Sequence, residues 1–281
     1  MRFLVLTFVS LLAACHHVPD AGQSRFGAQL YTVRGDMERD PIATLGRVAS
    51  LGYREVEFAG TFGIAPAELC DRTRALGITV AAAHADWRLL RDDPAAALDE
   101  ADALCTDTLV LAWLPAEQRR TLDQWHWWVD HLNRVSAMAA VRDMRIAYHA
   151  HDFEFEELEG TRPIDLLFAG LDPRIGFELD TYWLAKSGVD PLGFLMEKRD
   201  RVTHLHLKDM ASDGAMADVG EGTLDLAEIV AQARRQGFEH FLVERDDARD
   251  PWASLAASLD SLHAMALQQH TPETAFRSAE Q

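Results

Sequence analysis

The chain has 281 residues, 48% of them hydrophobic, and its 45 acidic against 27 basic residues give a formal net charge of −18. A field of this sign repels nucleic acids and anionic lipids at long range, so the composition argues against a DNA-processing role. The hydrophobic content is sufficient for a substantial core in one large domain or two small ones.

The first fifteen residues, MRFLVLTFVSLLAAC, have the pattern of an export signal. Their apolar run is too short to span a bilayer of ~30 Å as a helix. The sequence Leu12-Ala13-Ala14-Cys15 resembles a bacterial lipobox, which implies cleavage before Cys15 and its lipidation; an ordinary signal peptide is the alternative. We expect a lipoprotein signal peptide at 1–15, a polar tether at 16–25, and an exported protein anchored by lipid to a bacterial membrane, facing the periplasm, with the outer membrane favoured.

The remaining chain alternates between short β-rich runs and helical patterns. The predicted strands are 26–33, 53–60, 78–85, 107–114, 145–152, 174–181, 201–208 and 240–246. The predicted helices are 40–52, 65–77, 93–105, 121–143, 162–170, 190–200, 224–237 and 251–267, several of which begin at Asp-Pro and end at Gly. Eight such units predict a parallel (β/α)₈ TIM barrel over 26–281 rather than a doubly wound sheet, and no GxGxxG follows the first strand.

Polar side chains gather where the predicted strands end, which is the active-site end of such barrels. A structural ion-pair network explains some of this clustering, but not a carboxylate or imidazole from nearly every strand. The residues at these ends are Gln29, Arg34, Glu57, His84, Asp86, Trp87, Trp113, His149, His151, Asp152, Glu154, Glu178, Asp180, Tyr182, Trp183, His204, His206, Lys208, Asp209, Glu244, Arg245 and Asp246.

Several of these carboxylates need a cation. Glu154, Asp180 and Glu244 are expected to converge with only Lys208 as a fixed positive charge nearby, and unpaired buried carboxylates cost several kcal/mol each. One divalent metal ion would compensate them, and oxygen ligands with an imidazole suit Mn²⁺, Co²⁺, Mg²⁺ or Zn²⁺. Strand parity complicates one position, because Glu154 can face inward together with His149 only if the fifth strand ends or kinks near Asp152.

The chain resembles a known family over most of its length. The strings QLYTVR, GYREVEFAG, YHAHDFEF, ELDTYWLAKSGVDP, HLHLKD, VGEGTLD and VERD are similar to the xylose-isomerase-like TIM barrels, often called sugar phosphate isomerases/epimerases. The resemblance implies one divalent metal bound by Glu154, Asp180, His206 and Glu244. Ala150 departs from the Asn that relatives commonly have between the two His residues.

The resemblance also implies a reaction, in which a proton is removed next to a carbonyl and returned elsewhere. Glu154 and Glu244 would act as acid and base, with Lys208 and His84 as donors to oxygen; a salt bridge from Lys208 to Asp180 or Asp209 is the alternative. The remaining predicted substrate contacts are Gln29, Glu57, Trp113, His149, His151 and Trp183. A non-phosphorylated sugar is favoured, because export removes the chain from phosphorylated sugars and residues 211–225 contain acids but no Lys or Arg.

Three other functions stay open at this point. The first is a lyase or hydrolase that acts on 3-keto-glycosides with the same metal and Glu pair. The second is a non-catalytic sugar-binding lipoprotein, and the third, disfavoured by charge and export, is a three-zinc endonuclease. The expected partners are a small sugar or keto-glycoside and, through the lipid anchor alone, a membrane; an oligomer is allowed. Whether Cys70 and Cys105 pair is also open.

Overall fold

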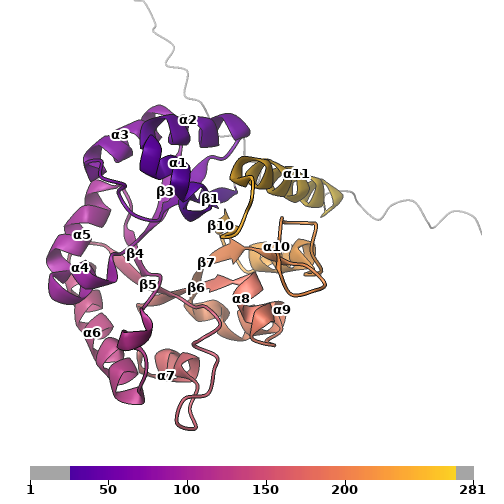
Figure 1. The fold of residues 1–281 in the computed structure, drawn as a ribbon. Helices are drawn as coiled ribbons and strands as arrows, with labels where there is room; N and C mark the ends of the chain where they lie inside the picture. Colours follow the sequence, from indigo (N-terminus) through magenta and orange to yellow (C-terminus); the bar gives the residue numbers. More distant parts are fainter. Residues whose placement is uncertain (1–25, 270–281) are drawn as a thin grey trace, which may run out of the picture.

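The computed structural model describes residues 26–269, which form a closed eight-stranded parallel barrel surrounded by helices (Figure 1). The strands follow one another around the barrel, and β1 closes it by pairing with both β2 and β10. The barrel strands are β1 (Gly27–Gln29), β2 (Glu55–Phe58), β3 (Thr79–His84), β4 (Thr108–Leu111), β5 (Arg145–His149), β6 (Gly176–Asp180), β7 (Val202–Leu207) and β10 (His240–Val243). The predicted (β/α)₈ barrel is therefore confirmed, with each strand inside its predicted range.

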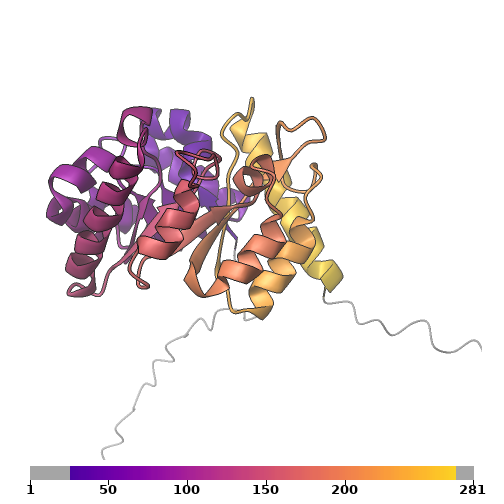
Figure 2. The ribbon, with the colours of Figure 1, turned by 90° about the horizontal axis from the view of Figure 1, so that it is seen from below.

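The helices cover the outside of the barrel in chain order, and Figure 2 shows them standing beside the strands. They are α1 (Arg34–Arg39), α2 (Pro41–Leu51), α3 (Pro66–Ala75), α4 (Trp87–Asp92), α5 (Pro94–Ala103), α6 (Leu122–Ala140), α7 (Pro163–Gly170), α8 (Thr181–Lys186), α9 (Pro191–Lys198), α10 (Leu226–Arg235) and α11 (Pro251–Gln269). None of the helices within 26–269 has both the length and the apolar character needed to cross a membrane.

Local sequence explains where many helices begin. Asp40, Asp93 and Asp190 each precede a Pro at the first helical position and accept a hydrogen bond from the backbone of the first turn. Thr121 and Gln124 form a capping box at the start of α6. These caps define the first residues of four helices on the outside of the barrel.

The barrel interior has a small apolar part and a large polar part. Ala82, Val110, Ala112 and Ala147 form a buried cluster of their own inside the barrel, separate from the core between strands and helices. Ionisable side chains on β2, β5, β6 and β7 are also buried, among them Glu57, Glu178 and His206. Since buried charges require partners, this polar interior is the feature that calls for a functional explanation.

A buried carboxylate organises the loop that follows β7. Asp209 begins the short hairpin of β8 (Asp209–Met210) and β9 (Met216–Ala217), and it accepts hydrogen bonds from four backbone N–H groups, those of Met210, Gly220, Gly222 and Leu224. A Cβ at Gly222 would lie 2.1 Å from Asp209 Oδ1, so only Gly fits there. Asp209 therefore fastens the loop rather than pairing with Lys208.

The structure also settles the pairing of the two cysteines beyond Cys15. Cys70 on α3 and Cys105 after α5 form a disulfide, with their Cα atoms 5.6 Å apart. The bond joins two neighbouring helix units on the outside of the barrel. The predicted signal peptide, tether and lipidation site at Cys15 lie outside the described residues and stay predictions.

Candidate functional site

A cavity of about 570 Å³ lies at the carboxyl ends of the strands, where barrels of this architecture place their active sites. It holds most of the predicted site residues and several others. Its lining consists of Tyr31, His84, Ala112, Trp113, Arg119, His149, His151, Asp152, Phe153, Trp183, Lys208, Glu244 and Asp246.

His206 on β7 lies just beneath this cavity, fully buried between carboxylates on both sides. Its Nε2 is 2.7 Å from Glu57 Oε2 and 3.2 Å from Glu178 Oε2. Its Nδ1 is 3.0 Å from Glu244 Oε2 and 4.0 Å from Asp180 Oδ2. The inward parity of alternate residues on β6 and β7 produces this arrangement, because it points Glu178, Asp180 and His206 into the barrel.

Gln29 and His84 complete the group on the Glu57 side. Gln29 Nε2 donates to Glu57 Oε2 at 2.7 Å and lies 3.0 Å from His84 Nε2. His84 Nε2 is 3.2 Å from Glu57 Oε1 and 3.4 Å from Glu178 Oε2. Strands β1, β2, β3, β6 and β7 therefore all contribute to one hydrogen-bonded cluster.

Lys208 neutralises part of the opposite side. Its Nζ lies 3.0 Å from Asp180 Oδ2, 2.8 Å from Glu244 Oε2 and 3.0 Å from Asp246 Oδ1, and the residue is 1% exposed. The other oxygen of Asp180 accepts hydrogen bonds from the backbone N–H groups of Tyr182 and Trp183 as the N-cap of α8. The Asp180 carboxylate is thus held in one orientation, with Oδ2 facing His206 and Lys208.

The pKa values of several residues in the site are shifted by the carboxylates close to them. Burial opposes a charge on His84, but Glu57 and Glu178 raise its pKa to about 10. Burial likewise opposes a charge on His206, yet Glu178 and Glu244 raise its pKa well above its usual value. Burial and the nearby Glu244 raise the pKa of Asp246 to about 6. The carboxylates of this cluster thus outnumber the fixed cation, Lys208. Their negative charge favours the protonated forms of His84, His206 and Asp246.

Two overlapping sets of side chains have the composition of a metal site. One consists of Glu57, His84, Glu178 and His206, and the other of His149, Asp180 and His206; within each, the potential ligand atoms lie within 4.8 Å of one another. Glu178 Oε1 is buried and accepts no hydrogen bond within residues 26–269. Carboxylates and imidazoles suit Mn²⁺, Co²⁺ or Zn²⁺, so these residues fit a divalent cation.

Glu154 lies outside both sets. It is fully buried, but its Oε1 accepts a hydrogen bond from the Tyr148 hydroxyl at 2.6 Å and its Oε2 one from the His151 N–H at 2.8 Å. Strand β5 ends at His149 and Glu154 lies in the turn that follows, so strand parity does not decide which way its side chain points. Burial raises the pKa of Glu154 to about 7, against the effect of its hydrogen bonds. Its assignment as metal ligand and base stays a prediction.

His149, His151 and aromatic rings form the walls of the cavity. The His151 ring stacks on Phe153, with centroids 5.3 Å apart, and lies 5.2 Å from Trp183; its Nδ1 is buried without a hydrogen-bond partner in the described chain. Trp113 is 50% exposed and Tyr31 41%, which places both at the rim. Such rings suit the C–H face of a sugar.

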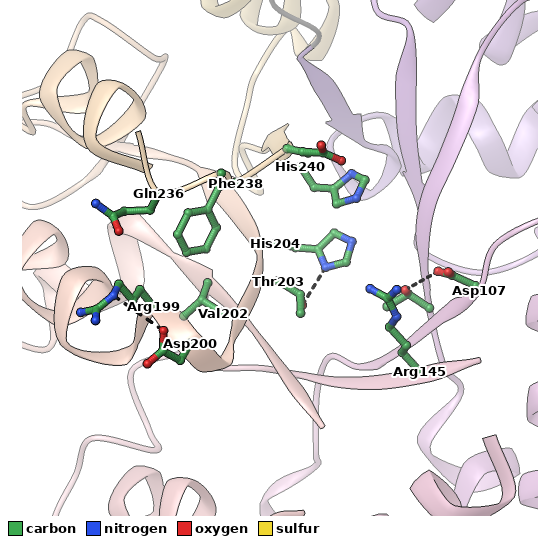
Figure 3. A pocket seen from close by; sticks show the side chains of 13 residues that line it. Asp107, Arg145, Arg199, Asp200, Val202, Thr203, His204, Gln236, Phe238 and His240 are labelled. Carbon is green, nitrogen blue, oxygen red and sulfur yellow. Dashed lines mark hydrogen bonds and ion pairs between the residues drawn. The ribbon is translucent and has the colours of Figure 1, made fainter. Parts of the chain in front are cut away.

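A second cavity, of about 440 Å³, opens at the amino ends of the strands (Figure 3). There the rings of His204 and His240 stack with centroids 4.6 Å apart, and His240 Nδ1 pairs with Glu55 Oε1 at 2.9 Å. The ionisable groups inside the barrel therefore divide into two layers. Among residues 26–269, only the layer at the carboxyl ends contains candidate cation sites.

Sequence reasoning missed some residues of the site. Glu178 was noted at its strand end but given no role, although it shares inward parity with Asp180 on β6. Asp246 has the same relation to Glu244. Arg119 lies 3.5 Å from the centroid of the Phe153 ring, and both belong to loops whose conformation no sequence pattern indicates.

Comparison with known proteins agrees with this geometry. Residues 45–265 match the family model described as a xylose isomerase-like TIM barrel. Inosose dehydratase from Geobacillus thermodenitrificans is 29% identical over 151 residues, which are 47% of this chain and 49% of that protein. Inosose dehydratase from Clostridium tetani is 28% identical over 151 residues, 46% of this chain and 50% of that protein. The chain thus spans about half the length of the curated relatives it matches.

Solved structures extend the likeness to nearly the whole barrel. A sugar phosphate isomerase/epimerase from Parabacteroides distasonis superimposes with a TM-score of 0.73 at 21% identity, covering 89% of this chain and 96% of that one. A D-tagatose 3-epimerase-like protein gives 0.64 at 14% identity, covering 87% and 99%. These identities show the fold alone. Because the family model matches most of the chain, the protein belongs to the xylose isomerase-like TIM barrel family.

Proposed function

We propose that the chain is a divalent-metal-dependent isomerase or epimerase of a non-phosphorylated sugar, which removes a proton from the carbon next to a carbonyl. One observation carries the proposal: His149, Asp180, His206 and Glu244 converge at the base of the 570 Å³ cavity. His149 and Asp180 end β5 and β6, His206 lies on β7 and Glu244 directly follows β10, and His149 and Glu244 also line the cavity that substrate would enter.

The cation would be held by those four residues, which include three of the four ligands inferred from the family resemblance. His149 takes the place expected for Glu154, because His149 belongs to one set of potential ligand atoms with Asp180 and His206, whereas Glu154 belongs to neither set. When bound, a divalent cation polarises the substrate carbonyl and stabilises the negative charge that develops on its oxygen. The kind of metal, among Mn²⁺, Co²⁺, Mg²⁺ and Zn²⁺, is part of the proposal's test.

Proton transfer is assigned to side chains that face the cavity. Glu244 and His151 both line it, and His151 Nδ1 has no competing hydrogen-bond partner in residues 26–269. One of them takes the proton as the C–H bond breaks and its electron pair moves onto the carbonyl oxygen, giving an enediolate. The other group, after taking a proton from solvent in the cavity, returns it to carbon. Lys208 balances the charge of Asp180 and Glu244 during this exchange. Each such acid or base contributes about 10²–10⁴-fold in rate.

The substrate is proposed to be a neutral sugar that stacks against Trp113, Trp183 and Phe153. Lys208, a cation of the cavity wall, is already paired with three carboxylates, and residues 211–225 of the following loop contain acids but no Lys or Arg. A phosphate group would therefore be repelled by that side of the cavity. The proposal places the enzyme outside the cytoplasm as a lipid-anchored protein, on the strength of the N-terminal sequence pattern.

A lyase is the second candidate, because the relatives from Geobacillus and Clostridium are named inosose dehydratases. The same proton removal next to a carbonyl is then followed by loss of the group on the neighbouring carbon, as hydroxide or as the aglycone of a 3-keto-glycoside. The two reactions share their first step and differ in the fate of the enediolate.

Proton exchange with deuterated water tests the shared step. Keto-sugars and 3-keto-glycosides are incubated with the metal-loaded protein in deuterated water, and NMR follows the hydrogen next to the carbonyl. We expect exchange that stops with a chelator and returns with Mn²⁺ or Co²⁺. Release of an aglycone or of water would select the lyase. Absence of exchange together with retained sugar binding would refute the enzyme and leave a sugar-binding protein.

Variants of three carboxylates give the matched comparison. Glu244→Gln should slow exchange by at least ~10²-fold. Glu55→Gln, which changes a carboxylate at the amino end of the same barrel, should leave it within about twofold. Glu154→Gln tests directly the prediction that Glu154 is a metal ligand and a base. Loss of both the bound metal and the proton exchange would support that prediction.

A further inference from the structure

The two ring nitrogens of His206 face different carboxylates. Nε2 is 2.7 Å from Glu57 Oε2, on the side of the barrel interior, whereas Nδ1 is 3.0 Å from Glu244 Oε2, on the side of the cavity. His206 and Glu57 are both fully buried. A neutral imidazole carries its proton on one nitrogen and a lone pair on the other, so only one of the two can bind a cation.

The position of Glu57 decides which nitrogen keeps the proton. Glu57 does not line the cavity, while Glu244 does, so the Glu244 side of His206 is the one that faces the cavity. A histidine that binds a metal almost always donates its other N–H to a carboxylate, carbonyl or water, which fixes its tautomer and orientation. Glu57 Oε2 is the nearest acceptor to Nε2, and Glu178 Oε2, at 3.2 Å, is the next.

The Glu57 carboxylate is itself held in place by contacts with Gln29 and His84. Gln29 Nε2 donates to the same Oε2 at 2.7 Å, and Gln29 Oε1 accepts from the Tyr31 N–H at 2.9 Å, which fixes the amide. His84 Nε2 lies 3.2 Å from Oε1. The acceptor is therefore fixed by β1 and β3 before any cation binds.

We propose that Glu57 is a positioning residue: it keeps the His206 proton on Nε2 and so directs the Nδ1 lone pair toward a cation held with His149, Asp180 and Glu244. The proposal rests on the proposed function, since it assumes that cation. It assigns no contact between Glu57 and either cation or substrate. The competing arrangement, in which Glu57, His84, Glu178 and His206 bind the cation themselves, is an outcome of the test.

Metal affinity measured by chelator competition provides the first readout, with Co²⁺ as the probe and circular dichroism confirming that each variant is folded. We expect Glu57→Gln to weaken Co²⁺ binding by about 10–100-fold, as loss of a carboxylate behind a metal-bound His does. Glu57→Met, which offers no acceptor, should weaken it further. Glu55→Gln on the same strand also removes a carboxylate from a His, that of His240, and should change affinity less than threefold.

The protonation of His206 is the second readout, which a purely structural role of Glu57 would not change. In the Zn²⁺-loaded protein with ¹⁵N-labelled histidine, long-range ¹H–¹⁵N NMR should show His206 protonated at Nε2 and metal-bound at Nδ1. In the Glu57→Met variant the Nε2–H signal should shift and exchange with solvent faster, because its acceptor is gone.

The outcomes separate this proposal from the proposed function. If Glu57→Gln binds Co²⁺ with wild-type affinity while Asp180→Asn abolishes binding, the role of Glu57 is overturned. The proposed function as a metal-dependent enzyme would then still stand. Loss of binding in His84→Ala but not in His149→Ala would make Glu57 a ligand and also overturn it. Failure of the wild-type protein to bind Co²⁺, Mn²⁺ or Zn²⁺ would overturn both proposals.

Discussion

Replacing Glu154 by Gln should change how the stability of the protein depends on pH. Glu154 is fully buried, and burial raises its pKa from the usual 4.5 to about 7. The folded state therefore binds a proton at this site more tightly than the unfolded state does. The stability that this proton contributes is fully present below about pH 4.5 and is lost as the pH rises through 7.

The size of the effect follows from the pKa difference. A shift of about 2.5 pKa units corresponds to about 3 kcal/mol, at 1.36 kcal/mol per unit. Gln does not ionise, so the Glu154→Gln variant should gain about 3 kcal/mol on the wild type between pH 4.5 and pH 8. All other titrating groups are common to both proteins and cancel in the difference.

Urea unfolding at pH 5, 6, 7 and 8, with a chelator present, measures this difference. The exposed Glu156→Gln serves as the control, and its effect should stay within about 0.5 kcal/mol at every pH. A difference between wild type and Glu154→Gln that does not vary with pH would refute the reasoning. A difference that grows in favour of the wild type would show an ionised Glu154, as expected of a residue that serves as a metal ligand.

Three further predictions concern stability. Replacing Cys70 and Cys105 by Ser together should lower the free energy of unfolding by about 4 kcal/mol, as expected for the opening of a 35-residue loop, and reductant should then have no further effect in urea titrations. Asp209→Asn should lower the free energy of unfolding by about 3 kcal/mol, because an amide –NH₂ would face backbone N–H donors. Asp213→Asn is the exposed control, and an equal effect of the two substitutions would contradict this explanation. Lys208→Met should destabilise by about 3–5 kcal/mol by leaving Asp180 and Glu244 unpaired, and millimolar Mn²⁺ should recover part of the loss in thermal melts; no recovery would argue against a cation at this place.

Local sequence predicted the barrel and the end at which the site lies. Strands and helices follow from short-range patterns, such as Asp-Pro before a helix and apolar runs of strand length. The period of two along β7 was enough to place His206 and Lys208 on one face, and the structure shows both pointing inward.

The composition of the site depended on the tertiary structure. Closure of the barrel by β1, β2 and β10 brings Gln29, Glu57 and His206 together from residues up to 177 positions apart, and no local pattern reports such contacts. The placement of Glu154 against Tyr148 depends on the turn after β5, and the Cys70–Cys105 bond on the packing of neighbouring helices. The sequence thus determined which chemical groups stand at the strand ends, because periodicity is local. Which of them meet was decided by strand pairing and loop conformation, because those contacts exist only once the whole barrel has closed.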